Sequence, residues 1–315
     1  MITTPIEEEY RALREGAGIT ELSWRGGLEL LGPDRLRFLH NYVTCDVKGL
    51  APGMGAYGFF TSPQGRILSD AVLLAQEDRL WVEVDEDQKE PVAAHLRKYI
   101  LADRVEVRTL DDMRPVLVLG PGAEAVLGTD LSSLDAPWRH ARITVHGTEV
   151  VVQRRGLSGV PAWTLWVSAS EAVLLAKRLV AEGARPVGFE ALEVLRAEAG
   201  IPRFGQDFGP DNFPQETGIE EAVSYTKGCY LGQEVVARIH YRGGVQNVLR
   251  GLVFDEGEPR QGAALIHDGR EAGRATTVVR SLALNQIVGL GILHRRVEPG
   301  TRVAVEGGGA ALVRP

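Results

Sequence analysis

The pair Gly243-Gly244 separates two parts of the chain that differ in pattern, and this division most constrains the fold. Beyond it the chain is rich in glycine, and short strand-like segments follow one another at regular spacing. Asp268-Gly269 lies between two of them and is typical of a two-residue hairpin turn. The expected strands are 249–254, 264–266, 272–276, 287–293 and 302–305. Closely spaced short strands of this kind predict a small C-terminal β-barrel.

The part before Gly243 mixes helix-like and strand-like segments. A strand followed by Gly-Pro and a helix occurs at 28–39 and again at 115–127. Ser168 and Glu171 have capping-box spacing, which predicts a helix that runs to 183. Further strands are expected at 58–61, 66–74, 80–84, 105–107, 143–145, 149–152 and 163–167, and further helices at 5–16, 85–99, 189–199 and 235–242. The mixture predicts the α+β class.

Composition indicates a soluble globular protein of two or three domains. The chain has 315 residues, of which 44% are hydrophobic and 24% charged. No apolar run is long enough to span a bilayer, and the N-terminus has no signal-peptide character, so no membrane association is expected. Cys45 and Cys229, the two cysteines, lie far apart in sequence, which predicts no disulfide framework and a reducing cytoplasm.

Charge and histidine spacing restrict the binding partners. A formal net charge of −7 argues against a general nucleic-acid binder, so stable nucleic-acid binding is not expected. A local cluster of basic residues leaves RNA binding open, although a solvated helix face is the commoner role of such a cluster. Its members are Arg238, His240, Arg242 and Arg250. The seven histidines are scattered without metal-ligand spacing, so no metal site is expected.

The segment 226–234 concentrates chemically active side chains. Cys229 follows a glycine and lies two residues after Lys227, and the segment leads into the helix expected at 235–242. The partial positive charge of a helix N-terminus and the nearby ammonium would both favour a thiolate at Cys229. The alternative is a buried structural cysteine.

The same segment resembles a known signature. Lys-Gly-Cys-Tyr-Leu-Gly-Gln-Glu followed by Val-Val-Ala-Arg is similar to the motif of the YgfZ-type folate-binding proteins, relatives of the glycine-cleavage T-protein (aminomethyltransferase). Segments 28–46, 57–73 and 192–218 and the glycine-rich C-terminus resemble this superfamily in the same order. The resemblance implies a three-domain arrangement around a central folate cavity. It assigns 1–50 with 138–243 to a folate-binding domain, 51–137 to an α+β domain and 244–315 to the barrel.

The resemblance also implies a site for tetrahydrofolate or a one-carbon-substituted form. Glu198 matches the glutamate that accepts both donors of the pterin ring. Trp24 would stack on an aromatic ring of the folate, and Lys227 would meet its glutamate tail. Tyr230 and Arg238 complete the folate-binding set, and Cys229 with Lys227 are the candidates for catalysis. A second glutamate, Glu216, follows a T-protein pattern, and a structural role is equally open for it.

One departure from the T-protein bears on activity. The T-protein has an aspartate shortly after an Asn-Ala strand end, whereas 84–90 of this chain has no Asn-Ala and no acid that aligns with it. The first interpretation is therefore a folate-binding accessory protein for iron–sulfur cluster assembly or repair, with iron–sulfur proteins or their assembly factors as partners and an indirect effect on tRNA modification. An aminomethyltransferase and a non-catalytic folate-dependent binding module stay open beside it.

Overall fold

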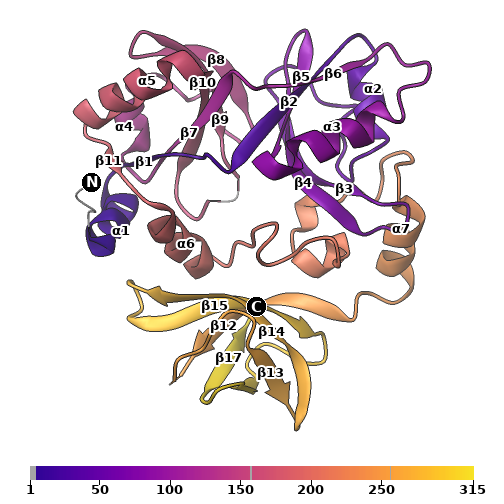
Figure 1. Ribbon diagram of the computed structural model, residues 1–315, viewed down its shortest axis with the longest axis vertical. Helices are drawn as coiled ribbons and strands as arrows, with labels where there is room; N and C mark the ends of the chain where they lie inside the picture. The colour runs from indigo at the N-terminus through magenta and orange to yellow at the C-terminus, as the bar shows by residue number, and fades with distance from the viewer. Residues whose placement is uncertain (1–4, 157, 256) are drawn as a thin grey trace. The chain divides into compact units, whose positions relative to one another are not determined.

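The computed structural model (Figure 1) describes residues 5–156, 158–255 and 257–315. Its internal contacts divide the chain into two compact units. Unit 1 contains Met1–Ser62, Leu68–Gly188 and Glu221–Leu231. Unit 2 contains Pro63–Ile67, Phe189–Glu220 and Gly232–Pro315.

Unit 1 contains a six-stranded sheet with the order β11-β1-β7-β10-β9-β8. All its pairings are antiparallel except that of β1 with β11. The two helices α4 (Ala123–Leu127) and α5 (Ala169–Ala181) bury Leu127, Leu175 and Leu179 in the apolar cluster of this sheet. The strands are β1 (Gly18–Glu21), β7 (Met113–Leu119), β8 (His140–Val145), β9 (Thr148–Arg154), β10 (Ala162–Ser168) and β11 (Arg185–Pro186).

Unit 1 also contains a five-stranded sheet with the order β3-β4-β5-β2-β6. Two helices, α2 (Arg35–His40) and α3 (Lys89–Arg97), cover it and share an apolar cluster with its strands (Figure 1). The rings of Trp81 and Trp166, one from each sheet of the unit, meet edge to face with centroids 6.1 Å apart. The strands are β2 (Arg25–Leu31), β3 (Gly55–Thr61), β4 (Ile67–Ala75), β5 (Arg79–Asp85) and β6 (Glu106–Thr109).

Unit 2 contains the expected C-terminal barrel, which is closed in the order β12-β15-β14-β13-β16-β17. Asp268 and Gly269 have φ of 51° and 71°, as a tight turn between paired strands requires, so the hairpin prediction is confirmed. The sequence did not predict the last strand, which closes the barrel against β12 and β16. The strands are β12 (Asn247–Phe254), β13 (Ala264–His267), β14 (Arg270–Ser281), β15 (Gln286–His294), β16 (Arg302–Val305) and β17 (Ala310–Arg314).

The other helices lie close to their expected bounds. They are α1 (Ile6–Glu15) in unit 1, α6 (Phe189–Glu198) and α7 (Gln233–Arg242) in unit 2, and the short 3₁₀ turns η1 (Glu86–Gln88), η2 (Pro214–Thr217) and η3 (Glu220–Ala222). The predicted capping box of α5 is wrong in detail, because Ser168 Oγ donates to Glu171 Oε2 at 2.9 Å and caps no backbone N–H. No helix within the described residues is long and apolar enough to cross a membrane.

Candidate functional site

Cys229 lies in an exposed loop of unit 1. The helix that follows, α7, begins at Gln233, four residues farther along the chain, after Gly232 with φ of 85°. The helix begins two residues earlier than expected, so Cys229 does precede its N-terminus. The field of a helix terminus acts mainly within its first turn, and a thiolate favoured by this terminus stays a prediction. The alternative of a buried structural cysteine is excluded for Cys229 by its exposure.

The neighbouring Lys227 is bound by backbone carbonyls of unit 1. Its side chain is buried, and Nζ donates to the carbonyl oxygens of His40 at 2.6 Å, Val43 at 2.6 Å and Cys45 at 2.9 Å. Burial lowers the pKa of Lys227 to about 8. All three protons of the ammonium are engaged, so a contact between Lys227 and a folate tail stays a prediction that would require breaking this arrangement. These three hydrogen bonds fix the loop of Cys229 to the end of α2 and the segment that follows it.

Tyr230 and Cys45, which lie beside the Lys227 ammonium, are both buried. The Lys227 ammonium lies over the ring of Tyr230, 4.8 Å from its centroid. Burial raises the pKa of Tyr230, and among the described residues its hydroxyl has no hydrogen-bond partner. Cys45 is buried beneath Gly58, where a Cβ would lie 2.6 Å from its sulfur, and burial raises the pKa of this thiol to about 12. Cys45 is therefore the structural cysteine, and Cys229 is the accessible one.

Trp24, the predicted stacking residue, is half-buried in the turn between β1 and β2. Its carbonyl accepts a hydrogen bond from the N–H of Glu86 at 2.8 Å, so this turn lies beside the end of β5. The next residue, Arg25, is buried and donates from Nε to Glu83 at 2.9 Å and from Nη1 to Asp85 at 2.7 Å. A third carboxylate, that of Asp70, lies 3.1 Å from the same Nη1. The structure thus places an ionic cluster next to Trp24.

This ionic cluster reaches from one sheet of unit 1 to the other. Arg155, which follows β9, donates to Glu83 Oε1 and to Thr164 Oγ1, each at 3.0 Å. Burial raises the pKa of Asp85, and the positive charge of Arg25 opposes this rise. Three carboxylates therefore face two guanidinium groups. Within the described part of the chain no three His, Cys, Asp or Glu side chains are arranged to hold a metal ion.

The sequence did not reveal this cluster, although two of its members carried a signal. Asp70 and Glu83 lie inside the strands expected at 66–74 and 80–84, where a buried carboxylate requires a partner. Nothing in the sequence identified Arg25 as that partner, because it lies 45 and 58 residues away from them.

Glu198, the predicted pterin ligand, is the last residue of α6 in unit 2 and is partly buried. Its Oε1 accepts a hydrogen bond from Ser281 Oγ at 2.6 Å, so β14 of the barrel orients the carboxylate. Arg238 is exposed on α7. Glu216 is buried and accepts the N–H of Phe213 at 3.0 Å, which gives it the structural role that the sequence left open.

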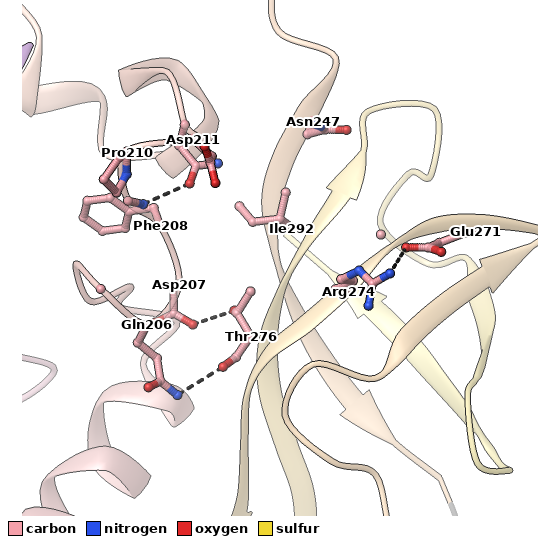
Figure 2. Close-up of a pocket in the computed structure, with 14 residues that line it drawn as sticks. Gln206, Asp207, Phe208, Pro210, Asp211, Asn247, Glu271, Arg274, Thr276 and Ile292 are labelled. Atoms are coloured by element: carbon pink, nitrogen blue, oxygen red, sulfur yellow. Dashed lines mark hydrogen bonds and ion pairs between the residues drawn. The ribbon is translucent and has the colours of Figure 1, made fainter. Parts of the chain in front are cut away.

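Unit 2 also contains a pocket of about 550 Å³ between the loop 205–212 and the barrel. Figure 2 shows Gln206 and Asp207 pointing toward Thr276 of β14. Asp207 Oδ1 accepts from Thr276 at 2.6 Å, and Gln206 Nε2 donates to the Thr276 carbonyl at 3.1 Å. The lining of this pocket includes no residue of the predicted folate set. The bonds of Gln206 and Asp207 to Thr276 hold this loop against the barrel.

The predicted site residues thus fall into two groups. Cys229, Lys227, Tyr230 and Trp24 lie in unit 1, and the first three belong to one loop. Glu198 and Arg238 lie in unit 2. Lys227 in the first group and Glu198 in the second are held by hydrogen bonds within their own units.

Comparison with known proteins gives concordant matches along the chain. Residues 2–227 match the family model of the GCVT N-terminal domain, and residues 247–313 match that of the glycine cleavage T-protein C-terminal barrel domain. The chain is 31% identical over 312 residues to an aminomethyltransferase of Bacillus velezensis, with 96% of this chain and 85% of that protein covered. It is 32% identical over 305 residues to an aminomethyltransferase of Geobacillus kaustophilus, with 93% and 83% covered.

A solved structure has the same fold. It is that of the glycine cleavage system aminomethyltransferase T from Bartonella henselae, which matches with a TM-score of 0.90 at 24% identity. The match covers 99% of this chain and 89% of that one. The expected T-protein-like α+β fold with a C-terminal barrel is therefore confirmed.

Proposed function

The chain belongs to the glycine cleavage T-protein family, and from this premise we propose that it binds a reduced folate, either tetrahydrofolate or a one-carbon-substituted form. The observation that carries the proposal is the position of Glu198 at the end of α6. Its carboxylate is fixed by Ser281 and is of the type that accepts the paired donors of a pterin ring. A pre-oriented acceptor loses little conformational entropy when the ligand binds.

Calorimetry with tetrahydrofolate tests this role. Replacing Glu198 by alanine removes a bidentate, charge-assisted contact, which should cost about 2–4 kcal/mol, or roughly 30-fold to 1,000-fold in Kd. Glu190→Ala is the matched control, because Glu190 is an exposed glutamate at the other end of the same helix. Equal dissociation constants for the Glu198→Ala variant and the unaltered protein would remove Glu198 from the site.

For the activity, we propose a folate-dependent accessory role in iron–sulfur cluster assembly or repair, with an indirect effect on tRNA modification. Its support is the loop of Cys229, where an exposed thiol lies two residues after a buried lysine whose ammonium binds three backbone carbonyls. Such a thiol can be reached by a partner protein or a small thiol. A single cysteine cannot hold a cluster alone, so the role proposed for Cys229 is transient.

Complementation tests the accessory role. Cys229→Ser, expressed in a strain that lacks the native protein, should fail to restore the activity of iron–sulfur enzymes. Because Cys229 is exposed, this variant should keep the thermal midpoint of the unaltered protein. Full recovery of iron–sulfur enzyme activity would leave the cysteine without this function.

Aminomethyl transfer is the second candidate, and the comparisons favour it, since the relatives named above are aminomethyltransferases. One feature of unit 1 argues against it. Asp85, which lies in the region where the T-protein aspartate is expected, is bound to Arg25 at 2.7 Å. Positioned proton transfer contributes about 10²–10⁴-fold to a rate, so its loss should leave only residual turnover.

An ammonia-release assay separates the two candidates. The protein is incubated with tetrahydrofolate and an aminomethyl-lipoyl donor, beside a working aminomethyltransferase as the reference. We expect release at least about 100-fold slower than in the reference. Comparable rates would establish aminomethyl transfer and overturn the accessory role, whereas the calorimetric result for Glu198 would stand either way.

A further inference from the structure

Unit 2 carries a patch of exposed basic and aromatic side chains, of which only Arg238 belongs to the predicted folate set. We call it the basic face, and its members are Arg238, His240, Tyr241, Arg242, Arg295 and Arg296. All six are exposed, and they come from the C-terminal half of α7 and from the chain just after β15.

Hydrogen bonds hold the two segments of the basic face side by side. Arg295 Nη1 donates to the carbonyl of Gly243 at 2.6 Å, immediately after α7 ends. The N–H of Arg295 donates to the carbonyl of Gln246 at 2.8 Å, and Asn247 is paired with His294 at the start of the β12–β15 ladder. The arginines of the helix and those of the β15 terminus therefore belong to one surface.

The local charge of this surface is opposite to that of the whole protein. The chain carries a net charge of −7, yet it contains no Asp or Glu from 235 to 254 or from 284 to 297. Among the residues that the structure describes, Arg238, Arg242 and Arg296 form no ion pair. Two exposed glutamates, Glu234 and Glu298, border the face, and its four arginines outnumber them. Charges are screened over about 8 Å at physiological salt, so the net local charge that a polyanion would meet on this face is positive.

Two aromatic rings lie among the cations. Tyr241 is 68% exposed, and its ring meets that of His240 edge to face with centroids 4.8 Å apart. Arginines that contact phosphates and an exposed ring that stacks on a base are the combination that binds single-stranded nucleic acid. An acidic protein surface would need the cations but not the exposed rings. We infer that the basic face binds single-stranded nucleic acid in a salt-sensitive manner.

Fluorescence anisotropy with labelled 12-nucleotide single strands of mixed sequence tests the inference. RNA and DNA strands are measured separately to determine which nucleic acid binds more tightly. Contact with four phosphates should give a slope of log K against log salt concentration of about −3, since each phosphate contributes about −0.7. Arg242→Ala and Arg296→Ala should each reduce that slope by about 0.7. Tyr241→Ala should weaken binding about 5-fold to 100-fold and leave the slope unchanged.

The matched control is Arg280→Ala, which removes the same charge from the far end of the β14–β15 ladder, where Arg280 is paired with Ile287. It should bind the strand as the unaltered protein does. A 12-residue oligoglutamate is the second probe. Oligoglutamate binding as tight as that of the strands, with no effect of Tyr241→Ala, would assign the face to an acidic protein and overturn the inference. Absence of binding at 50 mM salt, or an equal loss in Arg280→Ala, would also overturn it.

Discussion

In each unit an arginine meets several carboxylates, the buried Arg25 in unit 1 and the partly buried Arg196 in unit 2, and the two clusters differ in how completely their polar atoms are paired. In unit 2, Arg196 binds both oxygens of Glu193, at 2.9 and 2.7 Å, and donates to Asp207 Oδ2 at 2.6 Å. The other oxygen of Asp207 accepts from Thr276 and Thr277. Every carboxylate oxygen of this cluster has a partner.

The cluster of unit 1 is incompletely paired. Arg25 meets three carboxylates, and Arg155 is the second cation. Among the described residues, Glu83 Oε2 is buried without a hydrogen-bond partner. A fully paired cluster stabilises a fold, whereas a buried acceptor without a partner is costly and calls for a partner that a ligand or water can supply. The two clusters therefore differ in the pairing of their carboxylate oxygens.

The largest loss in the free energy of unfolding should follow from breaking the unit 2 cluster. Asp207→Ala leaves the Arg196 guanidinium and two threonine hydroxyls short of an acceptor in a buried place. We expect the free energy of unfolding to fall by about 3–5 kcal/mol. Denaturation in guanidinium chloride measures it, with Asp211→Ala, an exposed aspartate of the same loop, as the control. A loss below about 1 kcal/mol would contradict a structural role for Asp207.

A smaller loss in the free energy of unfolding should follow from a change in the unit 1 cluster. Glu83→Gln keeps the shape and one acceptor oxygen but removes the charge that Arg25 and Arg155 share. The expected loss in the free energy of unfolding is about 1.5–3 kcal/mol, the range for hydrogen bonds to charged groups. Glu77→Gln, at an exposed position, is the control. If Glu83→Gln cost as much as Asp207→Ala, the contrast between the clusters would fail.

The smallest effect concerns Asp85 and depends on pH. Burial raises the pKa of Asp85, so the folded protein holds this proton to higher pH than the unfolded chain does. Its contribution to stability is therefore complete below the unfolded pKa, near 3.9, and is lost as pH rises through the folded pKa. Relative to Asp85→Asn, the unaltered protein should lose about 1 kcal/mol or less between pH 4 and pH 7.

Urea denaturation at several pH values checks the Asp85 prediction, with the exposed Asp87→Asn as the control. A difference that grows in the opposite direction would mean that Arg25 outweighs the burial of Asp85.

The sequence predicted local features well and long-range pairing poorly. The barrel and its hairpin turn followed from glycine spacing and from the Asp268-Gly269 pair, which act over a few residues. Glu198 was placed correctly near the end of its helix, although its partner Ser281 lies 83 residues away and carried no signal. The carbonyls that bind Lys227 could not be predicted, since every residue has one and the fold alone decides which of them converge.

The ammonium of Lys227 has the environment of a dehydrated alkali-metal ion, with carbonyl oxygens in place of a hydration shell. Unlike such an ion, it is covalently tethered to the chain and cannot be exchanged, removed by a chelator or diluted away. The loop that contains Cys229 is therefore held in place whatever the concentration of metal ions. Because Lys227 is buried, amine-modifying reagents should label it only after unfolding. Fixation by a tethered ammonium fits the transient role proposed for Cys229, and it should weaken as pH rises through the pKa of Lys227, about 8.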